Sequence, residues 1–152
     1  MSEIDLIDKK MMEILAKDGR ISVTALAERV GLSKTPCQVR LKRLQTSGYI
    51  LGFRALLNME KLGLEHVAFA EVKLSSTTEA ALTAFNEAVR AIPEVEQCHM
   101  IASDYDYLLK VRTSDIFAYR RVLGEKISAL PGVASTSTFV SMEAVKDDPL
   151  AP

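Results

Sequence analysis

The spacing of apolar residues changes once along this 152-residue chain. Up to about residue 47 they recur every three or four positions, which is the spacing of one face of an α-helix. From residue 66 onward, segments in which every second residue is apolar alternate with two further helical stripes, and such segments are typical of half-buried strands. We therefore expect two units, an N-terminal helical one and a C-terminal α+β one.

The first block predicts three short helices, at about residues 5–18, 23–30 and 34–47. Asp5, Ser22 and Ser33 each precede a helix, and each can cap its first turn. Gly31 suits the left-handed backbone just past a helix end, and Leu32 can turn back into the core. Two helices joined by such a glycine-containing turn form a helix-turn-helix.

The third helix has two different sides. At 100° per residue, Cys37, Leu41 and Leu44 share the buried side. The outer side is basic, because residues 20–43 hold six Lys or Arg and only one acid in a chain of net charge −1. Arg40 lies at the edge between the two sides, where a salt bridge and a DNA contact are both open.

Such a face suits the major groove of DNA, where Gln pairs with adenine and Lys or Arg reaches guanine or phosphate. A solvated helix face, or a three-helix bundle that binds protein, would show a similar pattern. The predicted DNA-contacting residues are Ser22, Ser33, Lys34, Thr35, Pro36, Gln38, Val39, Lys42 and Arg43.

The stretch Gly48–Leu57 brackets β-branched and aromatic residues with glycines, which predicts a short strand or wing. A connector then runs to about residue 64. The expected domains are therefore 1–50 for DNA binding, 51–64 as a linker strand and connector, and 65–152 as a second domain.

The second domain has the order β-α-β-β-α-β, with strands near 66–74, 95–102, 107–113 and 134–142 and helices at 79–92 and 115–130. This is the ferredoxin-like arrangement, with both helices on one face of the sheet. The other face would expose Val67, Phe69 and Val95. An apolar face of this kind needs a cover, so we expect a homodimer joined sheet to sheet.

Several classes of protein are not indicated. No apolar run approaches the roughly 20 residues that span a bilayer, and the first residues lack the features of a secretion signal, so we expect a cytoplasmic protein. Cys37 and Cys98 lie far apart without neighbouring ligands, which disfavours a disulfide or a metal site. No nucleophile-and-base pair or phosphate loop is readable, so neither an enzyme nor a cofactor is expected.

Several motifs together resemble the leucine-responsive regulator/AsnC family of transcriptional regulators. They are Asp18-Gly19-Arg20, Leu26-Ala27, Val30-Gly31-Leu32-Ser33, Cys37, Arg40, Arg43-Leu44, Gly48-Tyr49-Ile50 and Asp104-Tyr105-Asp106-Tyr107-Leu108-Leu109. The resemblance covers nearly the whole chain. It implies a winged helix-turn-helix, a linker strand, and a domain that senses an amino acid and dimerises, with dimers assembling further into tetramers or octamers.

A narrower resemblance points to the proline-responsive branch of the family, carried by residues 33–40 and 136–146. Proline or leucine is the expected effector. One residue departs from the family pattern: Ser103 stands where a Gly usually precedes the Asp of the second turn.

An amino-acid effector presents an ammonium and a carboxylate, and a pocket must satisfy both. Asp104 or Asp106 can receive the ammonium, hydroxyls and turn N–H groups the carboxylate, and Tyr105 can wall the side chain. The expected effector site is Ser103, Asp104, Tyr105, Asp106, Thr136 and Thr138. Ordinary turn chemistry is the alternative for these residues. For the chain as a whole, two alternatives stay open: an architectural DNA-compacting protein, and a tetrapyrrole decarboxylase of the sirohaem type that shares the architecture.

Overall fold

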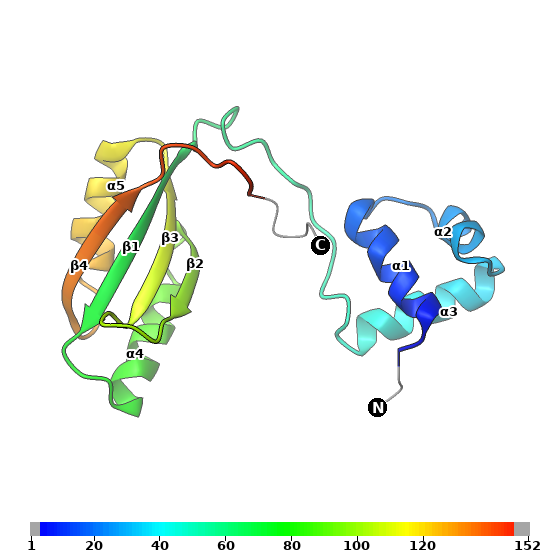
Figure 1. Cartoon of the computed structure of the whole chain (residues 1–152), viewed down its shortest axis with the longest axis horizontal. Helices are drawn as coiled ribbons and strands as arrows, with labels where there is room; N and C mark the ends of the chain where they lie inside the picture. The colour runs from blue at the N-terminus through cyan, green and yellow to red at the C-terminus, as the bar shows by residue number, and fades with distance from the viewer. Residues whose placement is uncertain (1–3, 148–152) are drawn as a thin grey trace. The chain divides into compact units, whose positions relative to one another are not determined.

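The computed structural model describes residues 4–147 (Figure 1). The chain divides into two compact units, one built on the residues up to Leu56 and one spanning Leu57–Lys146. Each unit has a hydrophobic core of its own. The expected fold class, with an N-terminal helical part and a C-terminal α+β part, is therefore confirmed.

The N-terminal unit consists of α1 (Leu6–Lys17), α2 (Val23–Val30) and α3 (Lys34–Thr46). Asp5 and Ser22 cap the first two helices as expected, each accepting a hydrogen bond from a backbone N–H of the first turn. Ser33 occupies the corresponding position before α3, but its side chain makes no capping hydrogen bond. The expectation that Ser33 caps this helix through its hydroxyl is therefore wrong.

Apolar side chains of all three helices meet in one cluster. Its buried members are Met11, Leu15, Leu26, Ala27, Val30, Cys37 and Leu44. Leu41 is only partly buried beside them. The buried side of α3 is thus the one that the helical spacing predicts, and the opposite side is left outward.

The segment after α3 differs from the expectation. Residues 47–65 carry no strand, although a short strand or wing was expected at Gly48–Leu57. Leu51 is 97% exposed and Leu56 74% exposed. A strand needs a hydrogen-bonded neighbour, and no segment of the described chain pairs with this one. Phe53 packs close to Gly19, since a Cβ added at that glycine would lie 3.2 Å from its ring.

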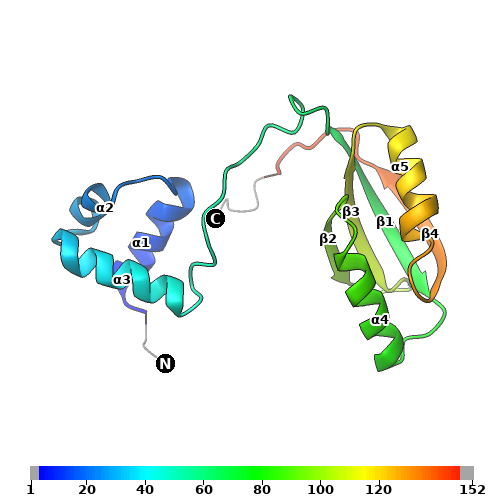
Figure 2. The same ribbon diagram turned by 180° about the vertical axis from the view of Figure 1, so that it is seen from behind.

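The C-terminal unit contains β1 (His66–Leu74), α4 (Glu79–Arg90), β2 (Val95–Met100), β3 (Tyr107–Thr113), α5 (Ile116–Val122) and β4 (Val133–Val140). The strands form one antiparallel sheet in the order β2-β3-β1-β4. This is the ferredoxin-like topology that the element order predicts. Figure 2 shows α4 and α5 on the same side of the sheet.

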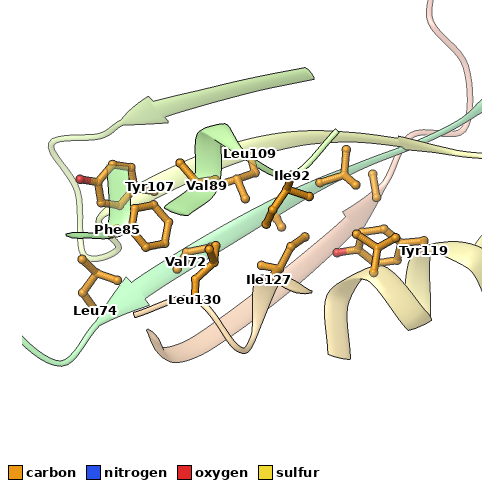
Figure 3. Close-up of a cluster of buried hydrophobic side chains, with 14 residues drawn as sticks. Val72, Leu74, Phe85, Val89, Ile92, Tyr107, Leu109, Tyr119, Ile127 and Leu130 are labelled. Carbon is orange, nitrogen blue, oxygen red and sulfur yellow. The ribbon is translucent and has the colours of Figure 1, made fainter. Parts of the chain in front are cut away.

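Alternate residues of the strands point toward the two helices and form the core (Figure 3). Phe85 of α4 stacks on Tyr107 of β3 with ring centroids 4.2 Å apart. On the opposite face, Phe69 and Phe139 lie directly across from each other on neighbouring strands, and Phe139 is 55% exposed. Val95 was expected on this open face, but it packs against the helix-side core instead, because the ladder of β2 shifts register between Val95 and Gln97.

The last helix is shorter than its apolar stripe indicates. After Val122 the chain makes a π-helical turn, Leu123–Ile127, in which Ser128 N–H donates to the Leu123 carbonyl. Val122 and Ile127 are both buried although five positions separate them. A wider turn, with bonds between residues five apart, brings these two onto one face, which an α-helix would not do.

Both cysteines are free thiols. Burial raises the pKa of Cys98 to about 11, so this thiol is a poor nucleophile at neutral pH. Within residues 4–147, no group of three or more His, Cys, Asp or Glu is placed to hold a metal ion. No helix in that range is long and apolar enough to cross a membrane.

Candidate nucleic-acid interface and effector site

The turn between α2 and α3 fixes the angle at which α3 leaves the core. Gly31 ends α2 with a left-handed backbone, φ 74°. The N–H of Leu32 then donates to the Ala27 carbonyl at 2.9 Å, and its side chain packs on the helical core. This is the hydrogen-bond pattern of a helix end that glycine permits, and it joins the two helices of the helix-turn-helix.

The outward side of α3 is polar apart from one aliphatic residue. Val39 is 65% exposed, and apolar contact of this kind can read a thymine methyl. The other expected DNA-contacting residues of α3 and its cap that lie fully on this exposed side are Ser33, Lys34, Thr35, Pro36, Gln38 and Lys42. Pro36 lies in the first turn, where its missing N–H leaves no helical bond unmade.

The two arginines of α3 differ from the lysines because α1 holds them. Nη1 of Arg40 donates to Asp5 Oδ2 at 2.6 Å and to Asp8 Oδ1 at 3.0 Å. Arg43 pairs with the other oxygen of Asp8 through Nη2. Arg43 was expected on the outer face, but the structure turns its guanidinium toward α1 and leaves the side chain 36% exposed.

Asp8 is the residue that the sequence reasoning missed. Its side chain is fully buried, although Asp8 is an acidic residue in the first turn of α1, a helix with one side exposed to solvent. The backbone of Asp8 donates to Asp5 and that of Asp5 donates to Asp8, which makes a capping box. The bond from the Asp8 N–H and then the Arg40 guanidinium lower the pKa of Asp5, and the carboxylates of Asp5 and Asp8 raise the pKa of Arg40. The sequence held one signal for this contact between α1 and α3, namely acids at positions 5 and 8 and arginines at positions 40 and 43.

Ser22 has a structural task as well. Its Oγ accepts from the Ala25 N–H at 3.1 Å, so this hydroxyl is in use at the start of α2. The residue is exposed, and the N-terminal turn of a helix can also offer N–H groups to a phosphate.

The turn between β2 and β3 carries four of the expected effector residues. Ser103 and Asp104 are exposed, and the Ser103 hydroxyl donates to Asp104 Oδ1 at 2.9 Å. That bond is the main reason why the pKa of Asp104 is lowered. Ser103 does not have a positive φ, so a serine at the family's glycine position fits this turn without left-handed strain.

Asp106 is bound to the neighbouring strand rather than free. Its Oδ2 accepts from the Leu74 N–H at 2.7 Å, and its own N–H donates to the Val72 carbonyl at 2.9 Å. Tyr105 is half-buried beside it. Of the two acids in the turn, Asp104 therefore keeps the more available carboxylate for an ammonium group.

The two threonines of β4 are not brought to this turn within one chain. Thr136 pairs with Val72 of β1, which in turn pairs with Tyr107 of β3, so Thr136 lies two strands away from the turn. The Thr138 hydroxyl forms a 2.6 Å hydrogen bond with that of Tyr119 on α5. The six expected effector residues therefore fall into two groups, four in the turn between β2 and β3 and two on β4.

Two shallow crevices mark this unit. One, of about 490 Å³, lies between α4 and β2 and reaches Met100 and Tyr107, which flank the turn. The other, of about 510 Å³, lies at the opposite end, where His66 and Asp115 face Val140 and Ser141. In that second crevice His66 donates through Nδ1 to Thr113, because the Thr113 hydroxyl already donates to the Asp115 carbonyl.

Both halves of the chain match known families. Residues 67–151 match the Lrp/AsnC ligand binding domain, and residues 4–50 match the winged helix-turn-helix DNA-binding family. The chain belongs to the Lrp/AsnC family.

Relatives in the Lrp/AsnC family are named as regulators. The chain is 68% identical over 145 residues to a proline dehydrogenase transcriptional activator of Rhizobium radiobacter, covering 95% of this chain and 93% of the relative. It is 45% identical over 144 residues to the leucine-responsive regulatory protein of Escherichia coli K12, covering 95% and 88%. This Lrp/AsnC protein is accordingly a transcriptional regulator with an amino-acid ligand-binding domain.

Solved Lrp/AsnC structures share the fold over the full length. An AsnC-family regulator from Agrobacterium tumefaciens aligns with a TM-score of 0.92 at 32% identity, covering 98% of this chain and 97% of that one. A regulator from Neisseria meningitidis in complex with L-methionine aligns with a TM-score of 0.90 at 30% identity, covering 99% and 97%.

Proposed function

We propose that this chain senses L-proline and controls transcription of a proline dehydrogenase gene. The observation that carries the proposal is the 68% identity, over 95% of the chain, to a relative named as a proline dehydrogenase transcriptional activator. A second relative with that name, from Rhodobacter capsulatus, is 54% identical. Both exceed the 45% identity to the leucine-responsive regulator.

Proline is bound, in this proposal, at the turn between β2 and β3. Asp104 is exposed and its pKa is lowered, so it is ionised at neutral pH and can accept from the secondary ammonium. The backbone N–H groups of the turn are the donors for the carboxylate, because the single hydroxyl proton of Ser103 is already donated to Asp104. Strand β1 separates Thr136 from the turn, and the Thr138 hydroxyl is bonded to Tyr119, so we assign these two threonines to the effector only where a second chain brings them to the turn.

Operator binding falls to the outward side of α3 inserted in the major groove. Gln38 is the candidate for adenine, Val39 for thymine, and Lys34 and Lys42 for phosphate or guanine. The exposure of these four side chains supports the assignment.

The open face of the sheet is the proposed homodimer interface. Phe69 and Phe139 form an apolar pair there, and Leu108 lies on the same face. Lys110 lies across from Phe69 on the neighbouring strand and pairs with Glu96 at 3.5 Å, so a paired charge borders the apolar residues on that side. An interface with an apolar core and polar rim is the usual form in stable homodimers. Assembly of dimers into tetramers or octamers is the further step, and light scattering during gel filtration measures it.

The test is thermal unfolding of the purified chain against each of the twenty amino acids. A ligand at 100 times its Kd stabilises the native state by about 2.7 kcal/mol, which moves a melting temperature by several degrees. Proline alone should give such a shift. A shift with leucine or methionine instead would discard proline and retain the sensor. No shift with any of them would leave an architectural DNA-binding protein as the better description, and a spectral change on adding a tetrapyrrole would indicate the decarboxylase alternative.

A further inference from the structure

Four charged residues at the contact of α1 and α3 form a closed set, which we call the charge clamp: Asp5, Asp8, Arg40 and Arg43. Asp8 is at its centre and has no exposed surface. One carboxylate oxygen accepts from Arg40, and the other accepts from Arg43 and from the Asp5 N–H. Both oxygens of the buried acid are therefore engaged, and both arginines are tied to a helix other than their own.

The clamp changes the charge that α3 presents to DNA. Four basic residues lie on this helix, and two of them, Arg40 and Arg43, have an acid as partner. Lys34 and Lys42 are exposed, and no acid among residues 4–147 forms an ion pair with either of them. Because a partly buried ion pair is screened less than a fully exposed one, Asp5 and Asp8 offset the charges of the two arginines, and the two lysines supply most of the positive field on the outward side of α3.

We propose that Asp8 is a positioning residue for DNA recognition, which withholds Arg40 and Arg43 from phosphates and fixes the rotation of α3 against α1. The inference rests on the proposed role of α3 as the DNA-contacting helix. Binding without sequence preference grows with the number of phosphates that a protein neutralises. Withholding two arginines therefore weakens binding to random DNA, while a fixed α3 keeps Gln38 aligned with base edges.

The clamp thus acts on the ratio between the affinity for preferred DNA and the affinity for random DNA. That ratio decides occupancy among many competing sites. A residue that served only stability would not affect this ratio. Its removal would reduce the amount of folded protein and weaken binding to every DNA alike.

The first variant is Asp8→Asn, which keeps the shape of the side chain and removes its charge. The probes are a duplex selected by the wild-type chain from a random pool and a scrambled duplex of equal length, each titrated by fluorescence anisotropy over a salt series. We expect tighter binding to scrambled DNA, a salt slope steeper by about one per bound chain, and at least about a tenfold loss of preference, the usual effect of a mispositioned base contact.

The matched control is Glu13→Gln, which makes the same charge change on an exposed position of the same helix. It should leave the preference between the two duplexes unchanged. The proposal is overturned if Asp8→Asn behaves like this control, or if it weakens both duplexes equally with an unchanged slope.

A second variant decides the matter should Asp8→Asn not fold, which circular dichroism reports. Arg43→Met leaves Asp8 paired with Arg40. If the clamp withholds Arg43, the salt slope on both duplexes stays as in the wild type. A slope lower by about one would mean that Arg43 contacts phosphate, and the proposal would be wrong.

Lys42→Ala separates the two proposals. If it changes neither the salt slope nor the affinity for either duplex, Lys42 contacts no DNA and the proposed function of this helix fails. If it lowers the slope while the Asp8 and Arg43 variants contradict the clamp, only the clamp fails.

Discussion

Asp106 and Asp104 lie two positions apart in one turn, and the structure predicts opposite consequences for their removal. Asp106 accepts a 2.7 Å hydrogen bond from the N–H of Leu74, at the end of β1. Asp104 is exposed, and the side-chain partner that its carboxylate has is the neighbouring Ser103 hydroxyl. Asp106→Ala should therefore destabilise the domain, and Asp104→Ala should act on the effector.

The size of the first effect follows from the bond. A hydrogen bond to a charged acceptor contributes about 1.5–3 kcal/mol, and Leu74 is buried, so its N–H would lose its partner without gaining water. Taking about 2 kcal/mol, and roughly 4–8 °C per kcal/mol for a domain of this size, Asp106→Ala should lower the melting temperature by roughly 8–16 °C. Asp104→Ala should change the free energy of unfolding by less than about 0.5 kcal/mol, as surface substitutions do.

The assay is thermal unfolding followed by circular dichroism, with and without proline at saturating concentration. Asp106→Ala should keep a proline-induced shift on a lowered baseline, and Asp104→Ala should keep the baseline and lose the shift. Equal melting temperatures for wild type and Asp106→Ala would refute the reasoning from the strand contact. A full proline shift in Asp104→Ala would remove Asp104 from the effector site.

Three further outcomes are expected. In urea unfolding of the N-terminal unit, Ser22→Ala should lower the free energy of unfolding by about 1 kcal/mol because it removes a capping hydrogen bond. Ser33→Ala should lower it by almost nothing because its side chain makes no such bond. Equal losses would contradict the capping geometry. The Lys126 ammonium lowers the pKa of Glu94 below 4.5, so the stability that this ion pair contributes is present above that pH and is lost as the pH falls through the lowered value. Glu94→Gln should therefore flatten the acid limb of a curve of stability against pH. An unchanged acid limb would exclude this pair as a source of acid sensitivity. Tyr119→Phe should lower the free energy of unfolding by about 1 kcal/mol through the lost 2.6 Å bond to β4, with chemical denaturation as the measurement and no change as the contrary result.

Much of the fold could be predicted from the sequence because burial imposes a period on it. The stripe of Cys37 and Leu44 placed the buried side of α3 correctly, and the alternation in β1 did the same for the sheet. Local rules also identified the caps at Asp5 and Ser22. They failed at Ser33, where the residue type and position suit a cap but the hydroxyl does not make the bond.

The remaining features depend on contacts between distant segments. The pairing of Arg43 with Asp8 joins residues 35 positions apart. Helical or strand periodicity relates residues within one element, so it does not predict this pair. The same holds for Thr138, whose partner is on α5, and for Asp106, which bonds to β1. A residue's polar character shows that it can bond, but which partner it takes is decided by how the helices and strands pack.

The π-helical turn at Leu123–Ile127 bears on how this chain can change in length. Lys126 reaches Glu94 while Ile127, the next residue, is fully buried. Removing one residue here, at exposed Gly124 for instance, would leave a regular α-helix in which the isoleucine follows Val122 by four positions. Residues four apart share one face of an α-helix, so the isoleucine would stay buried and the later side chains would keep their sides. In related chains a one-residue deletion at this turn should therefore need no change of residue type at the following positions, whereas a deletion of equal size inside α4 would turn every later side chain of that helix by about 100°.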